Sequence, residues 1–332
     1  MSLMWIPMLS LLGSLFAATT NKLSRTYAAL TIAIFPVVAL AIVLYHTSSV
    51  LDGNVIRESM QWIPLLGINV SFRLDGLALL FCLMILGIGL LIILYARYYL
   101  SSNDNMARFY TFLMLFMSAM LGIVLSNNVI QMWVFWELTS ISSFLLISYW
   151  WHSSDARQGA RMALTITGGG GLALLAGLVL LGNIVGSYNL DDILNNGHVI
   201  KEHALYPVTL ILILLGAFTK SAQFPFHFWL PHAMAAPTPV SAYLHSATMV
   251  KAGIFLLARF YPALSGTELW FAIVTLTGLS TLIVGAYVAL FKHDLKGLLA
   301  YSTISHLGLI TLLLGLDTEL AAVAAIFHII NH

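Results

Sequence analysis

Three ionisable side chains, Glu137, Lys220 and Lys251, lie deep inside long apolar stretches of the sequence. An ionised group near the centre of a bilayer costs at least about 2.5 kcal/mol, so each of the three requires an explanation. Burial disfavours the charged form of a carboxyl or an amine, whereas proximity of the two groups favours it. Moving them apart therefore shifts their proton affinities in opposite directions, which is the chemistry of a proton relay. The alternative is a static ion pair between Glu137 and one lysine that stabilises a helix bundle.

Histidines add further titratable groups in the second half of the chain. A single histidine on an apolar face is usually a packing residue, but six of them around two buried lysines favour a relay, because histidine titrates near neutral pH. Two of the six share a helix face at a four-residue spacing that also suits zinc. No general-base glutamate or third ligand accompanies that pair, so the sequence predicts no metal site. The six are His227, His232, His245, His306, His328 and His332.

The apolar stretch that holds Lys220 is interrupted by Pro225, and three more prolines follow within fifteen residues. Proline inside a helix removes a backbone hydrogen bond and clashes with the preceding turn. Broken helices at membrane depth occur where they are buried or line a water-filled cavity, and in transporters they mark the ion path. Lys220 is therefore the stronger of the two lysine candidates.

The composition is that of a membrane protein: 60% of the 332 residues are hydrophobic and 8% are charged. The mean hydropathy is +0.94, and a soluble domain carries roughly 25% charged residues. Apolar runs near the roughly 20 residues needed to cross a bilayer recur along the whole chain. We therefore predict an all-α polytopic protein. The expected spans are 3–18, 28–45, 75–96, 109–126, 128–150, 160–183, 207–230, 239–261, 268–290 and 297–315, and an eleventh begins near Leu320.

The stretch from Met1 to Phe16 is interpreted as the first span and not as a signal peptide, because Lys22 and Arg25 follow it and no small-residue cleavage site is present. The eleventh span is still running at His332, so we expect the sequence to be part of a larger protein.

Lysines and arginines in the connections predict an amino terminus on the outside, which places eight of the 14 on the cytoplasmic side. The expected location is a bacterial inner membrane. The eight are Lys22, Arg25, Arg97, Arg108, Arg157, Arg161, Lys292 and Lys296, whereas Arg57, Arg73, Lys201 and Arg259 fall outside.

Two outer connections are longer than simple turns. Residues 46–74 contain Trp62-Ile63-Pro64 and the alternating stretch Ile68–Phe72, which predict a short hairpin. Residues 184–206 hold Asp191, Asp192 and Asn195 in a polar, helix-like loop. Asp75, at the start of the third span, is interpreted as a helix N-cap.

Several motifs of other protein classes are absent. The four glycines at 168–171 follow no strand and precede no Gly-Lys-Ser/Thr, so they indicate close helix packing and not a phosphate loop. No Gly-x-Ser-x-Gly turn of a hydrolase occurs. The single cysteine, Cys82, excludes an intrachain disulfide, and a net charge of +1 gives no indication of nucleic-acid binding.

The segments Phe218–Pro231 and Ala236–Gly253 resemble the proton-conducting antiporter-like subunits of respiratory complex I and of Mrp multisubunit Na⁺/H⁺ antiporters. Phe135-Trp136-Glu137-Leu138 and Asp294–Ser305 match two further motifs of this family, and the resemblance covers essentially the whole chain.

The resemblance implies a core of about fourteen helices, built from two inverted five-helix repeats with a broken seventh helix. It implies three parts for this chain: N-terminal helices with an outer hairpin at 1–108, the first ion-translocation repeat at 109–261, and the start of the second repeat at 262–332. The implied relay residues are Glu137, Lys220, Lys251, His245, His328, His332, Lys296 and His227.

Lys251 and the run Phe226–Trp229 are more similar to the large A subunit of Mrp antiporters than to the complex I subunit, which usually has Thr in place of Lys251. The implied function is exchange of H⁺ for Na⁺ or K⁺ together with other membrane subunits, with no cofactor and no enzymatic reaction. Three alternatives remain: the proton-pumping arm of an NADH:quinone oxidoreductase, the membrane partner of an inorganic-carbon accumulation complex, and a scaffold without transport.

Overall fold

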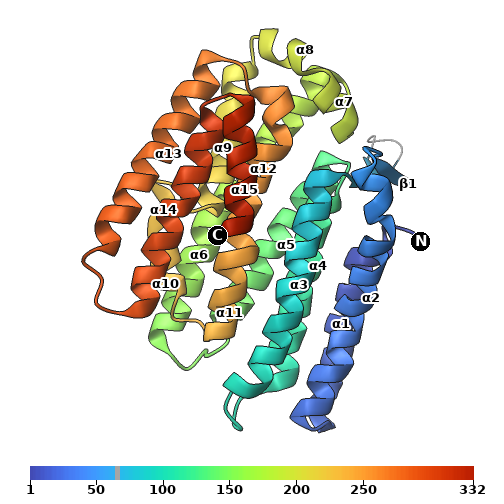
Figure 1. Ribbon diagram of the computed structural model, residues 1–332, viewed down its shortest axis with the longest axis vertical. Helices are drawn as coiled ribbons and strands as arrows, with labels where there is room; N and C mark the ends of the chain where they lie inside the picture. Colours follow the sequence, from blue (N-terminus) through green and yellow to red (C-terminus); the bar gives the residue numbers. More distant parts are fainter. Residues whose placement is uncertain (64–67) are drawn as a thin grey trace. The chain divides into compact units, whose positions relative to one another are not determined.

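The computed structural model describes residues 1–63 and 68–332, and the described chain is predominantly helical (Figure 1). Backbone packing divides it into two compact units. The first contains Met1–Trp151 and Ala236–Ala247, and the second contains His152–Ala235 and Thr248–His332. The three-part division that the family resemblance implies stays a prediction.

Among its described residues, the first unit contains apolar helices and a hairpin. Its elements are α1 Trp5–Ala17, the 3₁₀ turn η1 Thr20–Lys22, α2 Arg25–Leu51, β1 Ile56–Ile63, β2 Ile68–Leu74, α3 Gly76–Tyr99, α4 Met106–Leu125 and α5 Val129–Ile147. Two later elements pack with them, namely α11 Thr238–Ala242 and the π-helical turn η4 Tyr243–Ala247.

The second unit contains the remaining helices. Its elements are α6 Ser154–Val185, α7 Leu190–Asn195, α8 Gly197–Glu202, α9 Tyr206–Lys220, the 3₁₀ turn η3 Phe226–Phe228, α10 Trp229–Ala233, α12 Met249–Leu264, α13 Glu268–Ala289, α14 Leu295–Gly315 and α15 Glu319–Asn331.

Eight of the eleven predicted membrane spans are confirmed by their length and composition. In the described chain, eight helical segments are long and apolar enough to cross a membrane, one of them running from Thr238 to Leu264, and α1, α9 and α15 are shorter apolar helices. Most of these helices begin at a polar residue whose side chain accepts a hydrogen bond from a free backbone N–H of the first turn. These N-caps are Ser24, Asp75, Asn105, Asn128, Ser153, Thr267, Asp294 and Thr318.

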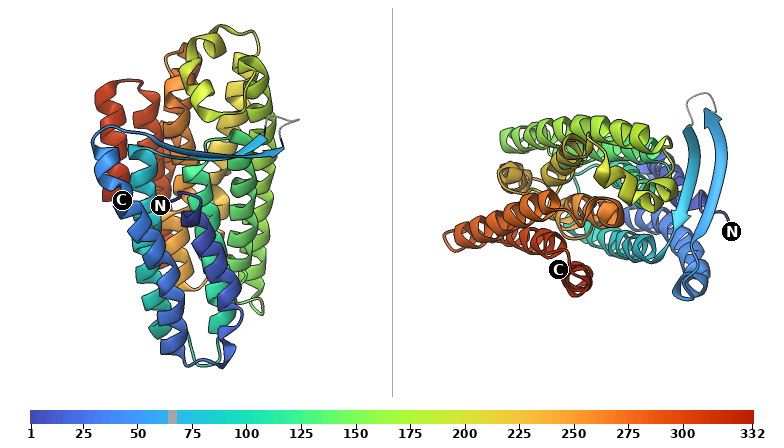
Figure 2. Two further views of the ribbon diagram at one scale, coloured as in Figure 1. Left: turned by 90° about the vertical axis from the view of Figure 1, so that its right-hand side faces the viewer. Right: turned by 90° about the horizontal axis from the view of Figure 1, so that it is seen from above.

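The predicted hairpin is confirmed as two antiparallel strands, in which Ile56 pairs with Leu74 and Ser59 pairs with Ser71 (Figure 2). The expectation that the connection starts at residue 46 is wrong, because α2 continues to Leu51. Pro64, which also supported the hairpin prediction, lies outside the described residues.

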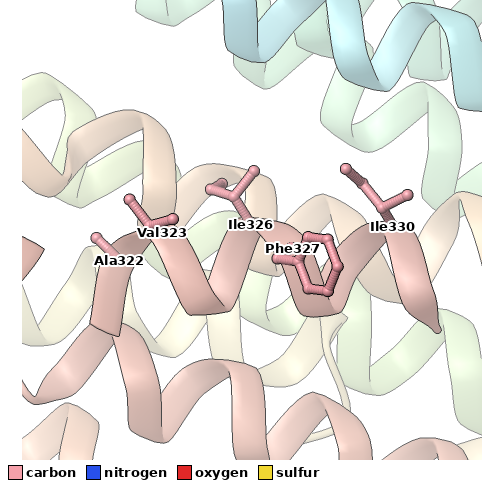
Figure 3. A pocket seen from close by; sticks show the side chains of 5 residues that line it. All are labelled: Ala322, Val323, Ile326, Phe327 and Ile330. Carbon is pink, nitrogen blue, oxygen red and sulfur yellow. The ribbon is translucent and has the colours of Figure 1, made fainter. Parts of the chain in front are cut away.

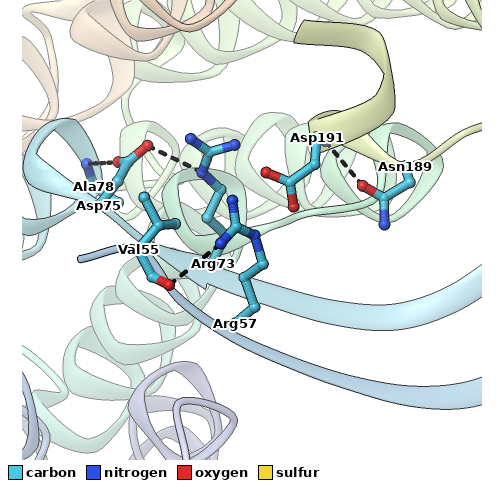
Figure 4. A network of polar contacts seen from close by, with 7 residues as sticks. All are labelled: Val55, Arg57, Arg73, Asp75, Ala78, Asn189 and Asp191. Carbon is cyan, nitrogen blue, oxygen red and sulfur yellow. Dashed lines mark hydrogen bonds and ion pairs between the residues drawn. The ribbon is translucent and has the colours of Figure 1, made fainter. Parts of the chain in front are cut away.

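Strand β2 is tied to α5 by main-chain and side-chain hydrogen bonds. The backbone N–H of Asn127 donates to Ser71 O at 2.8 Å, and the Ser71 N–H donates to Gln131 Oε1 at 2.8 Å. At the end of β2, Asp75 accepts from Ala78 N at 2.9 Å and pairs with Arg73 at 3.1 Å, as Figure 4 shows. The predicted N-cap role of Asp75 is therefore confirmed.

The polar loop predicted at 184–206 forms two short helices, α7 and α8. Asn189 caps α7 by accepting from Asp191 N at 2.8 Å, and the side chains of both residues appear in Figure 4. The prediction of a helix-like loop is thus confirmed.

Small residues allow close helix packing in the second unit. A Cβ on Gly170 of α6 would collide with the side chain of Thr219 of α9, and one on Gly278 of α13 would lie within 2.7 Å of the Leu312 backbone of α14. Such close approach is how helices associate where lipid, and not water, surrounds them. Of the glycine run in α6, Gly168 and Gly169 face open space, so only part of the run has the predicted packing role.

Candidate functional site

Glu137 lies near the middle of α5, as the sequence predicts. The preceding helix passes closely here, because a Cβ on Gly122 of α4 would collide with the ring of Phe135. Trp136 is fully buried, while Glu137 is partly exposed and has its Oε1 buried. The carboxyl group therefore combines a helix-fixed position with access from one side.

His245 lies in the same unit, on the π-helical turn η4, and is 2% exposed. The turn is held by Tyr243, which is fully buried and donates its hydroxyl to Ile85 O of α3 at 3.1 Å. The Tyr243 ring also stacks edge-on against Phe116 of α4, with the ring centroids 5.8 Å apart. Single π-helical turns inside α-helices are frequent at functional sites.

The span predicted over 239–261 is confirmed, but its helix is irregular around Thr248. After η4, Thr248 has φ −130° and ψ −88°, outside regular helix geometry, and α12 begins at Met249. The two halves of this span also pack in different units. The sequence has neither Pro nor Gly between Tyr243 and Thr248, so the local residues gave no sign of the irregularity.

Lys220 is the last residue of α9 and is fully buried. The predicted break of the seventh span is confirmed: Ala222 adopts a left-handed φ of 50°, and the chain continues through η3 and the short α10. A cation at the C-terminal end of a helix interacts favourably with the helix dipole, which offsets part of the cost of burying the ammonium group.

The backbone polar groups at this break find partners, as burial requires. Trp229 Nε1 donates to Thr219 O at 2.9 Å, and the Phe224 N–H donates to Thr281 Oγ1 of α13 at 2.9 Å. Ser221 Oγ donates to Ala217 O at 2.7 Å. The broken end of α9 is thereby fixed on two sides.

Lys251 lies in the first turn of α12 and is 1% exposed. Its Nζ donates to Ile329 O of α15 at 2.8 Å. Two residues later, Gly253 lies against the broken end of α9, since a Cβ there would collide with Ala217 O and lie 2.8 Å from Ser221 Oγ. The helix ends that carry the two buried lysines are therefore in direct packing contact.

Three histidines gather where Lys251 meets α15. His306 Nδ1 of α14 lies 3.0 Å from His328 Nε2, and the ring centroids of His306 and His332 are 5.0 Å apart. The shared face predicted for His328 and His332 thus meets a third ring. Sequence reasoning counted His306 among the titratable groups but left it out of the site, because neither helix alone reveals the rotation of α14 against α15.

No group of three or more His, Cys, Asp or Glu side chains in the described part of the chain has an arrangement that could hold a metal ion. The opposite face of α15 is apolar and forms a shallow groove lined by Ala322, Val323, Ile326, Phe327 and Ile330 (Figure 3). The helix therefore separates a polar, histidine-bearing side from an apolar one.

Lys296 and His227 both contact residues of the segment 221–235, which follows the break in the seventh span. Lys296 Nζ, in the first turn of α14, donates to Met234 O at 3.1 Å. The His227 ring stacks on Phe224 with a centroid separation of 5.7 Å.

Arg259 is counted on the outer side of the membrane, and that assignment stays a prediction. Arg259 lies inside α12, is 5% exposed, and holds its guanidinium 5.1 Å from the centre of the Phe255 ring one turn earlier. The cation–π contact explains how the helix accommodates this charge.

Comparisons with known proteins agree with this architecture. The family described as NADH:quinone oxidoreductase/Mrp antiporter, TM, matches residues 126–332, and the N-terminus of chain 5 of NADH-ubiquinone oxidoreductase (complex I) matches residues 62–110. A probable K⁺/H⁺ antiporter subunit of Rhizobium meliloti is 64% identical over 85% of this chain and 28% of its own length. A putative antiporter subunit mnhA2 of Staphylococcus haemolyticus is 49% identical over 98% of this chain and 42% of its own length.

Solved structures give the same picture. The Mrp complex from Dietzia sp. superposes with a TM-score of 0.92 at 37% identity, over 99% of this chain and 36% of that one. The archaeal membrane-bound sulfane sulfur reductase shares the fold, with a TM-score of 0.87 at 23% identity over 100% of this chain and 68% of its own. This chain thus spans less than half the length of the curated relatives it matches. With the family match covering more than half of its residues, the chain belongs to the NADH:quinone oxidoreductase/Mrp antiporter family of transmembrane proteins.

Proposed function

We propose that this chain is the proton-translocating part of the large A subunit of a multisubunit cation/proton antiporter. The observation that carries the proposal is the pair of fully buried lysines on two helix ends that pack against each other in the second unit. Desolvated amines are costly as permanent charges, and they become useful where a proton is passed on.

The proposed relay uses Glu137, Lys220, Lys251, His245, His328 and His332, with Lys296 and His227 as further members. The hydrogen bond from Lys251 to the backbone of α15 supports this assignment, because it leads from the lysine to a turn flanked by two histidines. A neutral imidazole can accept a proton at one nitrogen and release one from the other, so a histidine pair can conduct protons without moving.

The exchanged cation is Na⁺ or K⁺. The relative at 64% identity is named a K⁺/H⁺ antiporter subunit, which supports K⁺ for this chain. Its partners are other membrane subunits of the complex. This is supported by relatives that are named antiporter subunits and by the similarity to a chain of the Mrp complex. We place the complex in a bacterial inner membrane with the amino terminus outside.

The test uses everted vesicles that contain the complete complex, energised to an acidic interior. Addition of K⁺ or Na⁺ should release protons from the vesicles, and Glu137→Gln should abolish this release because the amide cannot take up a proton. The matched control is Ser142→Ala on the same helix. It removes a hydroxyl that donates to Leu138 O but no titratable group, so proton release should persist.

Assembly of the complex is measured alongside by native gel electrophoresis. Proton release that persists in Glu137→Gln with normal assembly would favour a scaffold role. Proton movement that requires NADH and no added cation would favour the redox-driven alternative.

A further inference from the structure

Two adjoining cavities open beside the start of α4 in the first unit. One has a volume of about 290 Å³ and the other about 250 Å³. They share Asn21, Asn105 and Ala107 as lining residues, so the two cavities adjoin. We refer to them together as the α4 pocket.

The two parts of the α4 pocket differ in chemistry. The larger part is lined by polar groups that include Thr20, Arg25 and Asp104. The smaller part is lined by Ala18 and Phe112 together with Arg108. A molecule that fills both parts must therefore have a polar, charged end and an apolar end.

The described hydrogen bonds of both arginines go to neutral carbonyl oxygens. Arg25 Nη2 donates to Ser101 O at 2.7 Å, and Arg108 Nη2 donates to Tyr149 O at 2.7 Å. The Nε of Arg108 is buried without a hydrogen-bond partner in the described chain. Neither guanidinium forms an ion pair with a described carboxylate. A buried donor without an acceptor is costly, so an anion at this position would be stabilised.

The nearby carboxylate of Asp104 is already engaged. Its Oδ2 accepts from Ser101 N at 2.8 Å and from Ser101 Oγ at 3.0 Å, and its Oδ1 accepts from Trp150 Nε1 at 3.0 Å. Burial raises the pKa of Tyr149 to about 12, and Asp104 adds to this rise while Arg108 and Arg25 oppose it. Two positively charged arginines and one hydrogen-bonded aspartate thus lie near Tyr149, so the local charge is positive.

Ser102 and Asp104 place the pocket at the connection between α3 and α4. Tyr95, Tyr98 and Tyr99 at the end of α3 and Trp151 after α5 are exposed, as aromatic residues are at a membrane–water interface. We propose that the α4 pocket binds an anionic phospholipid, with its phosphate between Arg25 and Arg108 and the start of its acyl chains along Ala18 and Phe112.

The test uses the complete complex in nanodiscs made of equal parts phosphatidylglycerol and phosphatidylcholine, followed by native mass spectrometry of the lipids retained. Arg25→Gln removes one guanidinium whose described hydrogen bond is solvent-exposed, so folding is preserved. Asn21→Trp fills the shared part of the pocket from an exposed position without changing the charge. Each variant should retain phosphatidylglycerol about tenfold more weakly.

Arg97→Gln is the matched control. Arg97 bonds Thr26 and covers the Tyr98 ring at 4.3 Å, and it lines neither part of the pocket, so its loss should leave lipid retention unchanged. Equal retention by Arg25→Gln, Asn21→Trp and the parent complex would overturn the proposal. Displacement of the lipid by excess inorganic phosphate would also overturn it, because the pocket would then be a site for a free anion.

Discussion

The two buried lysines of the second unit lie at helix ends of opposite polarity. Lys220 closes α9 at its C-terminal end, where the helix dipole favours a positive charge. Lys251 opens α12 in its first turn, where the dipole opposes one, and it binds a backbone carbonyl of α15 instead. Two chemically identical side chains thus have unlike surroundings within one packed region. Under the proposed relay, a charge would be held more readily at Lys220 than at Lys251.

The largest effect on transport is expected when Lys220, the lysine whose charge the helix dipole favours, is removed. Lys220→Ala should reduce cation-driven proton release by roughly a hundredfold or more, as loss of a proton-transfer group does. Lys220→Arg keeps a permanent charge but cannot release its proton, so it should also be inactive. Both are measured in everted vesicles at equal amounts of assembled complex. Activity retained by Lys220→Arg would mean that the charge alone, and not proton transfer, matters at this helix end.

The contact between the two helix ends is tested next. Gly253→Ala places a methyl group against Ala217 O and Ser221, so it should destabilise the complex by about 1–3 kcal/mol and lower transport. Gly168→Ala is the matched control, because its Cβ would meet nothing within 4 Å. Thermal unfolding of the purified complex should show a lower midpoint for the first variant only. Equal midpoints would show that the α9–α12 contact is looser than described.

Replacing each lysine by methionine sharpens the comparison further. Lys251→Met removes a buried charge at the unfavourable helix end, so stability should be maintained or increased. Lys220→Met also removes a favourable dipole interaction, so it should be less stable than Lys251→Met by about 1 kcal/mol. Differential scanning fluorimetry of the two variants under identical conditions measures the order. The reverse order would contradict the role assigned to the helix dipoles.

The smallest effect on transport is expected at the support of the α9 break. Trp229→Phe keeps an aromatic ring but leaves Thr219 O without its indole donor, at a cost of about 1–3 kcal/mol. Transport should fall only slightly, because Lys220 itself is unchanged. The measurement is cation-driven proton release at two temperatures. A loss as large as that of Lys220→Ala would show that the Trp229 indole does more than stabilise the break.

Much of this architecture is predictable because membrane burial leaves a strong pattern. Apolar runs marked the eleven helical segments, and Pro225 marked the break after Lys220. The irregular turn around His245 could not be predicted, because its cause is the packing of Tyr243 on α3 and α4 and not a local residue preference. The contact of His306 with His328 required the relative rotation of two helices. The contact of Arg259 with Phe255 could not be predicted either, because a charge near a span end is expected to face water.

The span from Thr238 to Leu264 changes packing partners partway along its length, between Ala247 and Thr248. His245 lies just before that boundary and Lys251 just after it. The segment is therefore a covalent linkage between two independently packed bodies. His245 in the π-helical turn and Lys251 at the start of the next helix thus share one short stretch of backbone across that boundary.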